Sequence, residues 1–252
     1  MSLRDYPELW RLARARGRSE EDYRRFQAFQ AGLIIRHLER HGVLLGGRRL
    51  LDLGSGFGGY SRAFAGRGAS VVSLDLVQPA GLLSPTVKPV RGSALDLPFR
   101  GESFDIVFCA SLIEHVASPG RLLEEVERVL APDGFAYVSF PPYWSPVGGH
   151  EFSPFHYLGE RLAIRLARRR AAPPEWVHRV QDRPAGPRSF ESLYRGWGLY
   201  RMTIRRMRRL LSATRWERLD LSTRYLPVSF VRWPLLGELL TWHAQFLLRK
   251  RA

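Results

Sequence analysis

The amino-acid sequence predicts an α/β fold in which one mostly parallel sheet is covered by helices on both faces. Two observations lead to this prediction. Between residues 48 and 140, short runs rich in valine, leucine and isoleucine alternate with segments of helical periodicity, which is the pattern of strand–helix–strand units. The chain has 252 residues, enough to bury one full α/β core, and this length requires no second domain.

Seven strands are expected, at residues 48–54, 69–76, 87–94, 103–111, 135–140, 216–226 and 242–250. Helices are expected at about 6–42, 60–68, 119–134 and 200–214, and the third of these closes on a Pro and Gly stop signal. Residues 141–200 are rich in Pro, Gly, aromatic residues and His. This composition predicts an insertion after the fifth strand and not more sheet.

Composition excludes several classes of protein. A hydrophobic share of 45% with 12% aromatic residues is typical of a globular chain. Cys109 is the only cysteine, so an internal disulfide or a multi-cysteine zinc site is excluded. The first residues lack the apolar core of a secretory signal, and the longest apolar stretch near the other end is cut by Arg232, Pro234, Glu238 and His243. We therefore predict a cytoplasmic protein.

A glycine-rich loop follows the first expected strand. In "LLDLGSGFGGY", Gly54, Gly56 and Gly58 lie between a buried strand and a helix, where bare backbone can approach a nucleotide cofactor closely. Gly54, Gly56 and Gly59 also fit the spacing of NAD-binding domains. Asp75, 21 residues past Gly54, can accept hydrogen bonds from a ribose in either class. The loop and Asp75 alone leave both cofactors open.

The whole stretch 50–140 resembles the class I methyltransferase family, in its small-metabolite, ubiquinone-biosynthesis-like branch. "LDLGSGFGG" resembles that family's first motif and "VVSLDL" its ribose-binding acid. "GSALDLPFRGESFDIVFCASLIEHV" and "LLEEVERVLAPDGFAYVSF" are similar to its adenine loop, fourth strand, following helix and fifth strand. The resemblance implies a methyltransferase enzyme with a Rossmann-like seven-stranded sheet and S-adenosylmethionine as its cofactor.

The resemblance also implies which residues bind the cofactor. Asp75 would hold the ribose hydroxyls, the loop would pass under the methionine moiety, and the segment at Ser93 would edge the adenine. Ser93 departs from the family, which often has Asp there, so we expect a weaker or water-mediated contact with the adenine amino group. The implied cofactor-binding residues are Asp52, Gly54, Ser55, Gly56, Gly58, Asp75, Leu76, Ser93, Ala94 and Ala110.

These segments give one methyltransferase domain over residues 1–252. Within it, residues 1–47 are expected to form an N-terminal helical lid and 48–140 the cofactor-binding core. Residues 141–200 are then a substrate-side insertion, and 201–252 a C-terminal helix with strands.

The insertion holds the candidate catalytic residues. Its sequence "PPYWSPVGGHEFSPFHYLGERLA" offers His150, Glu151 and His156 in an aromatic setting suited to a pocket wall. A histidine there could take a proton from an acceptor hydroxyl, and the alternatives are a plain pocket wall or a metal site formed by the same three residues. Glu114 and His115 in "IEHV" are expected to serve packing and capping.

The predicted function is methyl transfer in line from S-adenosylmethionine to a hydroxyl of a small or lipid-linked, sugar-like acceptor. Two alternatives stay open. One is C-methylation of a quinone-type ring, which would need less of a hydroxyl-directed base. The other is a protein that keeps the cofactor fold without turnover and binds a membrane or RNA. No metal is expected to take part.

Charge is distributed unevenly along the chain, which has a net charge of +15. Residues 1–140 carry 18 Lys and Arg against 16 Asp and Glu, whereas residues 141–252 carry 21 against 8. "RLAIRLARRR" and "RMTIRRMRRLL" interleave Arg with apolar residues, as basic amphipathic helices do. We therefore expect a small-molecule acceptor and peripheral contact with anionic membrane. Nucleic acid is a weaker candidate because no RNA- or DNA-binding module accompanies the arginines.

Overall fold

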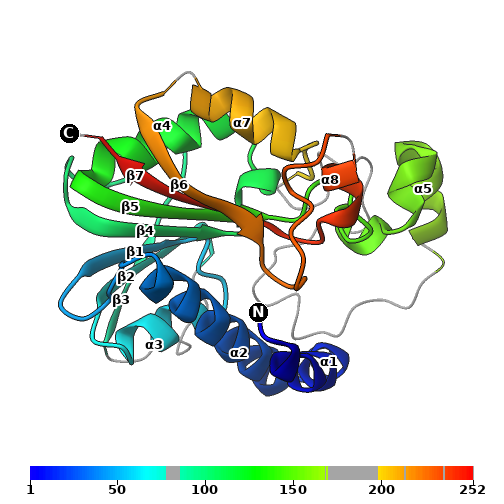
Figure 1. Ribbon diagram of the computed structural model, residues 1–252, viewed down its shortest axis with the longest axis horizontal. Helices are drawn as coiled ribbons and strands as arrows, with labels where there is room; N and C mark the ends of the chain where they lie inside the picture. Colours follow the sequence, from blue (N-terminus) through cyan, green and yellow to red (C-terminus); the bar gives the residue numbers. More distant parts are fainter. Residues whose placement is uncertain (78–85, 168, 170–197, 213, 235, 252) are drawn as a thin grey trace.

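The structure is a computed structural model that describes residues 1–77, 86–167, 169, 198–212, 214–234 and 236–251 (Figure 1). Its sheet contains β1 (Arg49–Leu53), β2 (Ser70–Asp75), β3 (Val87–Arg91), β4 (Phe104–Ala110), β5 (Leu130–Phe140), β6 (Trp216–Thr223) and β7 (Ala244–Lys250). The strand order is β3-β2-β1-β4-β5-β7-β6. Strands β1 to β5 are parallel, and β7 lies antiparallel between β5 and β6. The predicted seven-stranded, mostly parallel sheet is confirmed.

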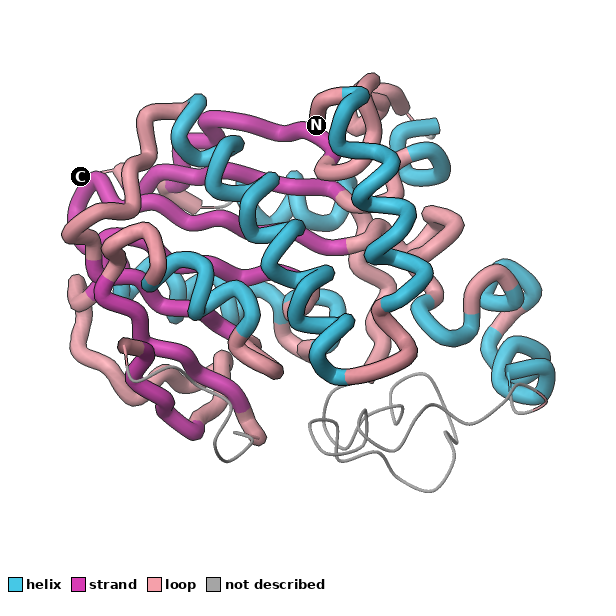
Figure 2. Tube along the Cα trace, turned by 90° about the horizontal axis from the view of Figure 1, so that it is seen from below, coloured by secondary structure: helices cyan, strands magenta, loops and turns pink. Residues whose placement is uncertain are grey.

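Helices cover both faces of the sheet, as predicted. The helices are α1 (Tyr6–Ala15), α2 (Glu20–Arg40), α3 (Gly59–Ala65), α4 (Pro119–Val129), α5 (Glu160–Ala167), α7 (Ile204–Ser212) and α8 (Leu236–Leu240), with short 3-10 turns η1 (Leu3–Asp5), η2 (Ile113–His115), η3 (His150–Phe152) and η4 (Phe155–Leu158). Helices α2 and α3 lie on one face and α4 and α7 on the other (Figure 1). Seen onto the first face, α2 runs across the strands (Figure 2).

The face under α2 and α3 is held by aromatic packing on the central strands. Phe108 of β4 stacks on Tyr137 of β5 with ring centroids 5.2 Å apart, and Phe64 of α3 meets Phe108 edge-on at 4.8 Å. All three side chains are buried together with Ile34 and Leu38 of α2. Burying each such side chain contributes about 1.5–3 kcal/mol, so this cluster fixes α2 and α3 against the sheet.

On the opposite face, α4 and α7 bury their apolar sides against the same strands. Leu122 and Val126 of α4 and Met207 of α7 are fully buried in one cluster with Val107 and Val138. Strand β4 is buried on both faces over almost its whole length, as expected for the centre of a parallel sheet. The core thus holds the carboxyl ends of β1, β4 and β5 in fixed positions.

Several element boundaries differ from the predicted ones. The N-terminal region is two helices, because Ser19 caps α2 by accepting a 3.1 Å hydrogen bond from the Asp22 N–H. The predicted helix 119–134 ends at Val129, since Leu130 turns extended and pairs with Phe104 in the sheet. Pro132, which lacks an N–H, favours this early stop.

The predicted insertion contains η3, η4 and α5 around a small core of its own. Tyr143, Phe152 and Ile164 form this core with Leu199. Residues 168 and 170–197 of the insertion lie outside the described residues. None of the helices in the described part of the chain combines the length and apolar composition needed to cross a bilayer.

Candidate functional site

The candidate site lies at the carboxyl ends of the parallel strands. Strand β1 sits between β2 and β4, so the chain order reverses direction across the sheet at this point. In open α/β sheets, ligands bind in the crevice outside the carboxyl ends of the strands at such a switch point. The residues directly after β1, β2 and β4 therefore line the candidate site.

The glycine loop after β1 adopts a left-handed backbone at three positions. Gly54, Gly56 and Gly58 have φ values of 72°, 50° and 69°, which glycine adopts at no steric cost. A Cβ added to Gly54 would lie 3.1 Å from Leu112, whereas a Cβ added to Gly56 would meet nothing within 4 Å. The backbone at Gly56 therefore faces open space, as a loop that approaches a cofactor requires.

Asp75 holds this loop from the end of β2. Its Oδ2 accepts a 2.8 Å hydrogen bond from the Gly56 N–H, and its Oδ1 accepts one of 3.2 Å from the Val77 N–H. The side chain is buried, and burial raises the pKa of the carboxyl despite these hydrogen bonds. Leu76 beside it remains 40% exposed. The structure thus places Asp75 and Leu76 at the rim of the site, where the predicted ribose contact stays a prediction.

Asp52 lies below the loop and not in its open face. Its carboxylate accepts a hydrogen bond from the Ser61 hydroxyl of α3, and both side chains are buried. Burial raises the pKa of Asp52 to about 7, and the charge of Asp75 adds to the effect, while the Ser61 hydrogen bond opposes it. Asp52 therefore supports the loop through α3. Ser55, which the resemblance also implied, is buried within the turn, and its carbonyl accepts from the Gly58 N–H at 2.8 Å.

The segment predicted to edge the adenine is tied down by α4. Ser93 Oγ accepts a 3.1 Å hydrogen bond from the Leu95 N–H, and the Leu97 N–H donates to Glu125 at 2.8 Å. Ala94 is buried in this turn, and Ala110 ends β4 on the same edge of the sheet. These contacts give the segment a fixed shape, and its role toward adenine stays a prediction.

One of the predicted catalytic residues lies beside a buried acid. His150 Nε2 is 3.6 Å from Oε1 of Glu114, and its ring centroid is 4.8 Å from that of His115. Glu114 follows β4 in η2 and is 1% exposed. Neither of its carboxylate oxygens has a hydrogen-bond partner among the described residues. Burial raises the pKa of Glu114 to about 7, whereas His115 and Arg224 lower it.

The other two predicted catalytic residues are placed differently. His156 is buried inside the insertion, where its ring lies 5.5 Å from that of Tyr143 and 4.0 Å from that of Tyr157. A Cβ on Gly149 would lie 2.3 Å from the His156 ring. Glu151 is half-buried in η3. The structure therefore brings together His150 and Glu114, and keeps His156 as a packing residue of the insertion.

The metal interpretation of the insertion changes for the same reason. His150, Glu151 and His156 do not converge, whereas one ligand atom each from Glu114, His115 and His150 lie within 4.8 Å of one another. Glu114 and His115 were expected to serve packing and capping. Within the described part of the chain, these two residues and His150 are the group placed to hold a cation at this site.

Three further polar residues at this edge were not predicted. Ser111, at the end of β4, has its Oγ 3.2 Å from Nε2 of His243, and burial holds the pKa of His243 well below its usual value. Arg224 follows β6 and is buried. Sequence gave no signal for them, because Ser111 and His243 are 132 positions apart and arginines are common throughout this half of the chain.

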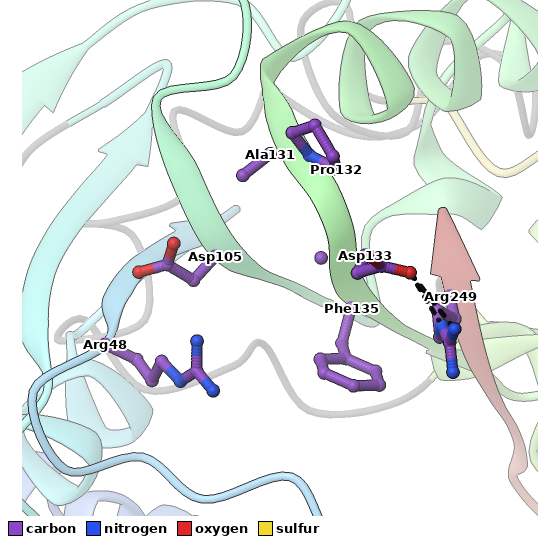
Figure 3. Close-up of a pocket in the computed structure, with 8 residues that line it drawn as sticks. Arg48, Asp105, Ala131, Pro132, Asp133, Phe135 and Arg249 are labelled. Atoms are coloured by element: carbon purple, nitrogen blue, oxygen red, sulfur yellow. Dashed lines mark hydrogen bonds and ion pairs between the residues drawn. The ribbon is translucent and has the colours of Figure 1, made fainter. Parts of the chain in front are cut away.

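A cavity of about 350 Å³ lies at the opposite, amino edge of the sheet (Figure 3). Three of the charged residues that line it are paired, Arg249 with Asp133 at 3.0 Å and Asp105 with Arg49 at 2.8 Å, and Arg48 also lines the cavity. Ligand crevices of this architecture lie at the carboxyl edge. This cavity is therefore no part of the candidate site.

Comparison with known proteins agrees with this geometry. Residues 51–138 match the methyltransferase domain family. An uncharacterized methyltransferase of Mycobacterium avium is 38% identical over 140 residues, which is 53% of this chain and 55% of the relative, and one of Mycobacteroides abscessus is 35% identical over 147 residues, 54% and 57% of the two chains. The chain thus spans about half the length of the curated relatives it matches.

Solved structures share the fold at low sequence identity. The crystal structure of an S-adenosylmethionine-dependent methyltransferase from Mesorhizobium loti has a TM-score of 0.57 at 22% identity and covers 85% of this chain and 96% of its own. The structure of the [4+2]-cyclase SpnF has a TM-score of 0.53 at 18% identity, with 87% and 80% covered. These likenesses concern the fold.

Fold, loop and comparisons together agree on a methyltransferase domain at residues 51–138 of this chain. The resemblance predicted from the sequence is confirmed over residues 51–138, which match the methyltransferase domain family, and S-adenosylmethionine is the cofactor that this resemblance implies. The residues present fit that cofactor, because open space faces Gly56 and the buried acid Asp75 lies at the loop.

We predict that Asp75→Ala weakens the binding of S-adenosylhomocysteine by roughly 10- to 150-fold, equivalent to about 1.5–3 kcal/mol for lost charged hydrogen bonds. Isothermal titration calorimetry measures this. Asp105→Ala is the matched control, because Asp105 lies near the start of β4, at the opposite edge of the sheet. A variant at Asp75 that binds within twofold of the parent would show that this carboxylate is not the ribose ligand.

The buried carboxyl of Glu114 predicts a specific pH dependence of stability. Its pKa is about 7 in the folded chain and near 4.5 when unfolded. As pH rises from about 4.5 to 7, the unfolded chain loses the proton while the folded chain keeps it. The contribution of Glu114 to the free energy of unfolding therefore falls across this window and stays low above it. The free energy of unfolding of Glu114→Gln, taken relative to that of the parent, should therefore increase from pH 5 to pH 8. Denaturant unfolding at both pH values measures this difference. An equal difference at both pH values would contradict the raised pKa.

Proposed function

We propose that the whole chain is an S-adenosylmethionine-dependent methyltransferase that methylates a hydroxyl group of a small or lipid-linked, sugar-like acceptor. The observation that supports this most directly is the pair formed by His150 and Glu114 at the carboxyl edge. Glu114 lies two residues past Leu112, which packs on Gly54 of the glycine loop. The pair is therefore next to the loop that carries the cofactor.

Bound S-adenosylmethionine supplies a methyl group already activated by its sulfonium, so the protein has to align the acceptor and accept its proton. His150 is the residue for proton removal, because a histidine can take a proton near neutral pH. Glu114 lies on the Nε2 side of the ring, so Nδ1 is the nitrogen that would take the proton of the acceptor hydroxyl. An ionised Glu114 would then stabilise the imidazolium that forms.

His243 is less suited to this role. It is 6% exposed, and burial and the nearby charge of Arg224 keep its pKa well below the usual value. A base whose conjugate acid is so weak takes protons poorly at neutral pH. The side chain of His150 is 22% exposed, which leaves it accessible to an acceptor.

The geometry of the site gives less support to the two alternative functions. C-methylation of a quinone-type ring makes little use of a histidine–carboxylate pair. A protein of this fold need not transfer methyl groups, since the [4+2]-cyclase SpnF shares the fold and fold alone does not fix the reaction. The glycine loop with open space at Gly56 favours a working cofactor site.

Exposed apolar side chains gather at the carboxyl edge and support the lipid-linked class of acceptor. Helices α5 and α8 lie at the same end of the sheet (Figure 1). Around them, the exposed large apolar residues are Trp144, Val147, Tyr157, Leu158, Leu162, Val228, Trp233, Leu236, Leu239, Leu240 and Trp242. Arg161, Arg165 and Arg232 are exposed among them. An apolar patch with basic residues is typical of surfaces that touch anionic membrane, and we include such peripheral contact in the proposal.

We predict that His150→Ala lowers kcat by roughly 10²- to 10⁴-fold while leaving S-adenosylmethionine affinity unchanged, the usual contribution of a general base. Steady-state kinetics with radiolabelled methyl donor measure the effect. His156→Ala is the comparison, because His156 packs inside the insertion. If both variants turn over within about threefold of the parent, His150 is not the base and alignment alone carries the reaction.

The membrane contact has a separate test. The double variant Trp233→Glu with Leu240→Glu should sediment less than the parent with phosphatidylglycerol-containing vesicles, and added salt should weaken sedimentation of the parent. Leu44→Glu is the matched control, since Leu44 is 64% exposed in the loop before β1. Parent protein that ignores such vesicles at low salt would remove the membrane contact from the proposal.

A further inference from the structure

Arg224 is a buried cation whose hydrogen-bond partners are all hydroxyl groups. Its side chain follows β6 and the residue is 4% exposed. Nη2 donates to the Ser139 hydroxyl and, at 3.2 Å, to that of Tyr137. Nη1 donates at 3.4 Å to the hydroxyls of Tyr60 and Tyr225. The Nε–H has no partner among the described residues.

No carboxylate of the described chain lies within 4.0 Å of this guanidinium, since none of the ion pairs includes Arg224. A buried charge without a counter-ion is costly, because burial removes its hydration and hydroxyl dipoles replace only part of it. Arginine is also always charged, so it cannot relieve the cost by losing its proton. The missing counter-ion is therefore expected to come from a ligand.

A cavity of about 590 Å³ reaches Arg224 between α2 and the β6–β7 edge of the sheet. Arg36 and Arg40 of α2 line it as well. Both acids that line the cavity already form ion pairs. Asp5 pairs with Arg36 at 3.1 Å, and Glu39 pairs at 3.2 Å with Arg67, which lies outside the lining. The wall of the cavity is thus positive, and it has room for a small molecule.

Arg224 also connects this cavity to the site. Tyr60 lies in the first turn of α3, two residues after Gly58 of the glycine loop. The Ser139 carbonyl accepts a 2.8 Å hydrogen bond from the N–H of Ser111, at the carboxyl end of β4. A group held by Arg224 would therefore belong to a molecule that can extend toward the ends of β4 and β5.

We propose that Arg224 anchors an anion-binding site in this cavity that takes the carboxylate or phosphate group of a small molecule. The Nε–H that has no partner among the described residues can donate a charge-assisted hydrogen bond to an oxygen of either group. On the proposed function, this group is the acidic part of the methyl acceptor. That last assignment rests on the proposed function, whereas the anion site itself does not.

The test measures anion binding without turnover. The full chain, saturated with S-adenosylhomocysteine, is titrated with inorganic phosphate or with acetate at constant ionic strength, and its thermal midpoint is followed. The parent should show saturable stabilisation by at least one of these anions, which also tells phosphate from carboxylate. Arg224→Met should weaken that anion's affinity by about tenfold or more, and Arg224→Lys should weaken it less.

Arg249→Met is the matched control, because Arg249 lines the cavity at the amino edge and is paired with Asp133. It should bind the anion as the parent does. If Arg224→Met fails to fold, the comparison between the parent and Arg224→Lys decides. Absence of saturable binding to the parent, or equal binding by the Arg224 variants, would overturn the site. If the parent binds the anion but does not bind S-adenosylhomocysteine, the proposed function is contradicted and the anion site is not.

Discussion

The cofactor loop keeps its shape through two hydrogen bonds that come from the end of β2. The Leu74 carbonyl accepts from the Gly54 N–H at 2.8 Å, and the Asp75 carboxylate accepts from the Gly56 N–H at 2.8 Å. Because β2 pairs with β1 in register up to Leu53 and Leu74, any slip of these strands would release both bonds. The open backbone at Gly56, the start of α3 and the position of Tyr60 all depend on that register.

Most of the core could be predicted from the sequence because its signals are local. Most strands between residues 48 and 140 are apolar runs of strand length, and the glycines that turn the chain alternate within one short segment, at Gly54, Gly56 and Gly58. The site beyond the core could not be read in this way. Arg224 is separated from Ser139 by 85 positions and from Tyr60 by 164, so only the antiparallel return of β7 and β6 along β5 brings them together.

The same reasoning explains how far the catalytic prediction reached. Residue type alone identifies the histidines and the acid of the insertion as candidates, and the structure has His150 beside Glu114. Its partner was assigned to packing, because Glu114 precedes α4 in a position that often serves as a cap. In the structure Glu114 makes no such cap, and Ser118 precedes α4 instead. A buried carboxyl with neither oxygen hydrogen-bonded is an electrostatic property that spacing along the chain does not reveal.

Buried acids and a buried arginine share this edge of the sheet. Asp52, Asp75 and Glu114 are buried acids whose pKa values are raised by desolvation, so a cation brought among them lowers their pKa values and draws off their protons. Arg224 is a buried base on the β6 side, with hydroxyl partners that cannot neutralise it. On the proposed function, the cationic methyl donor is attracted to Asp75 beside the glycine loop, and an acidic acceptor is attracted to Arg224.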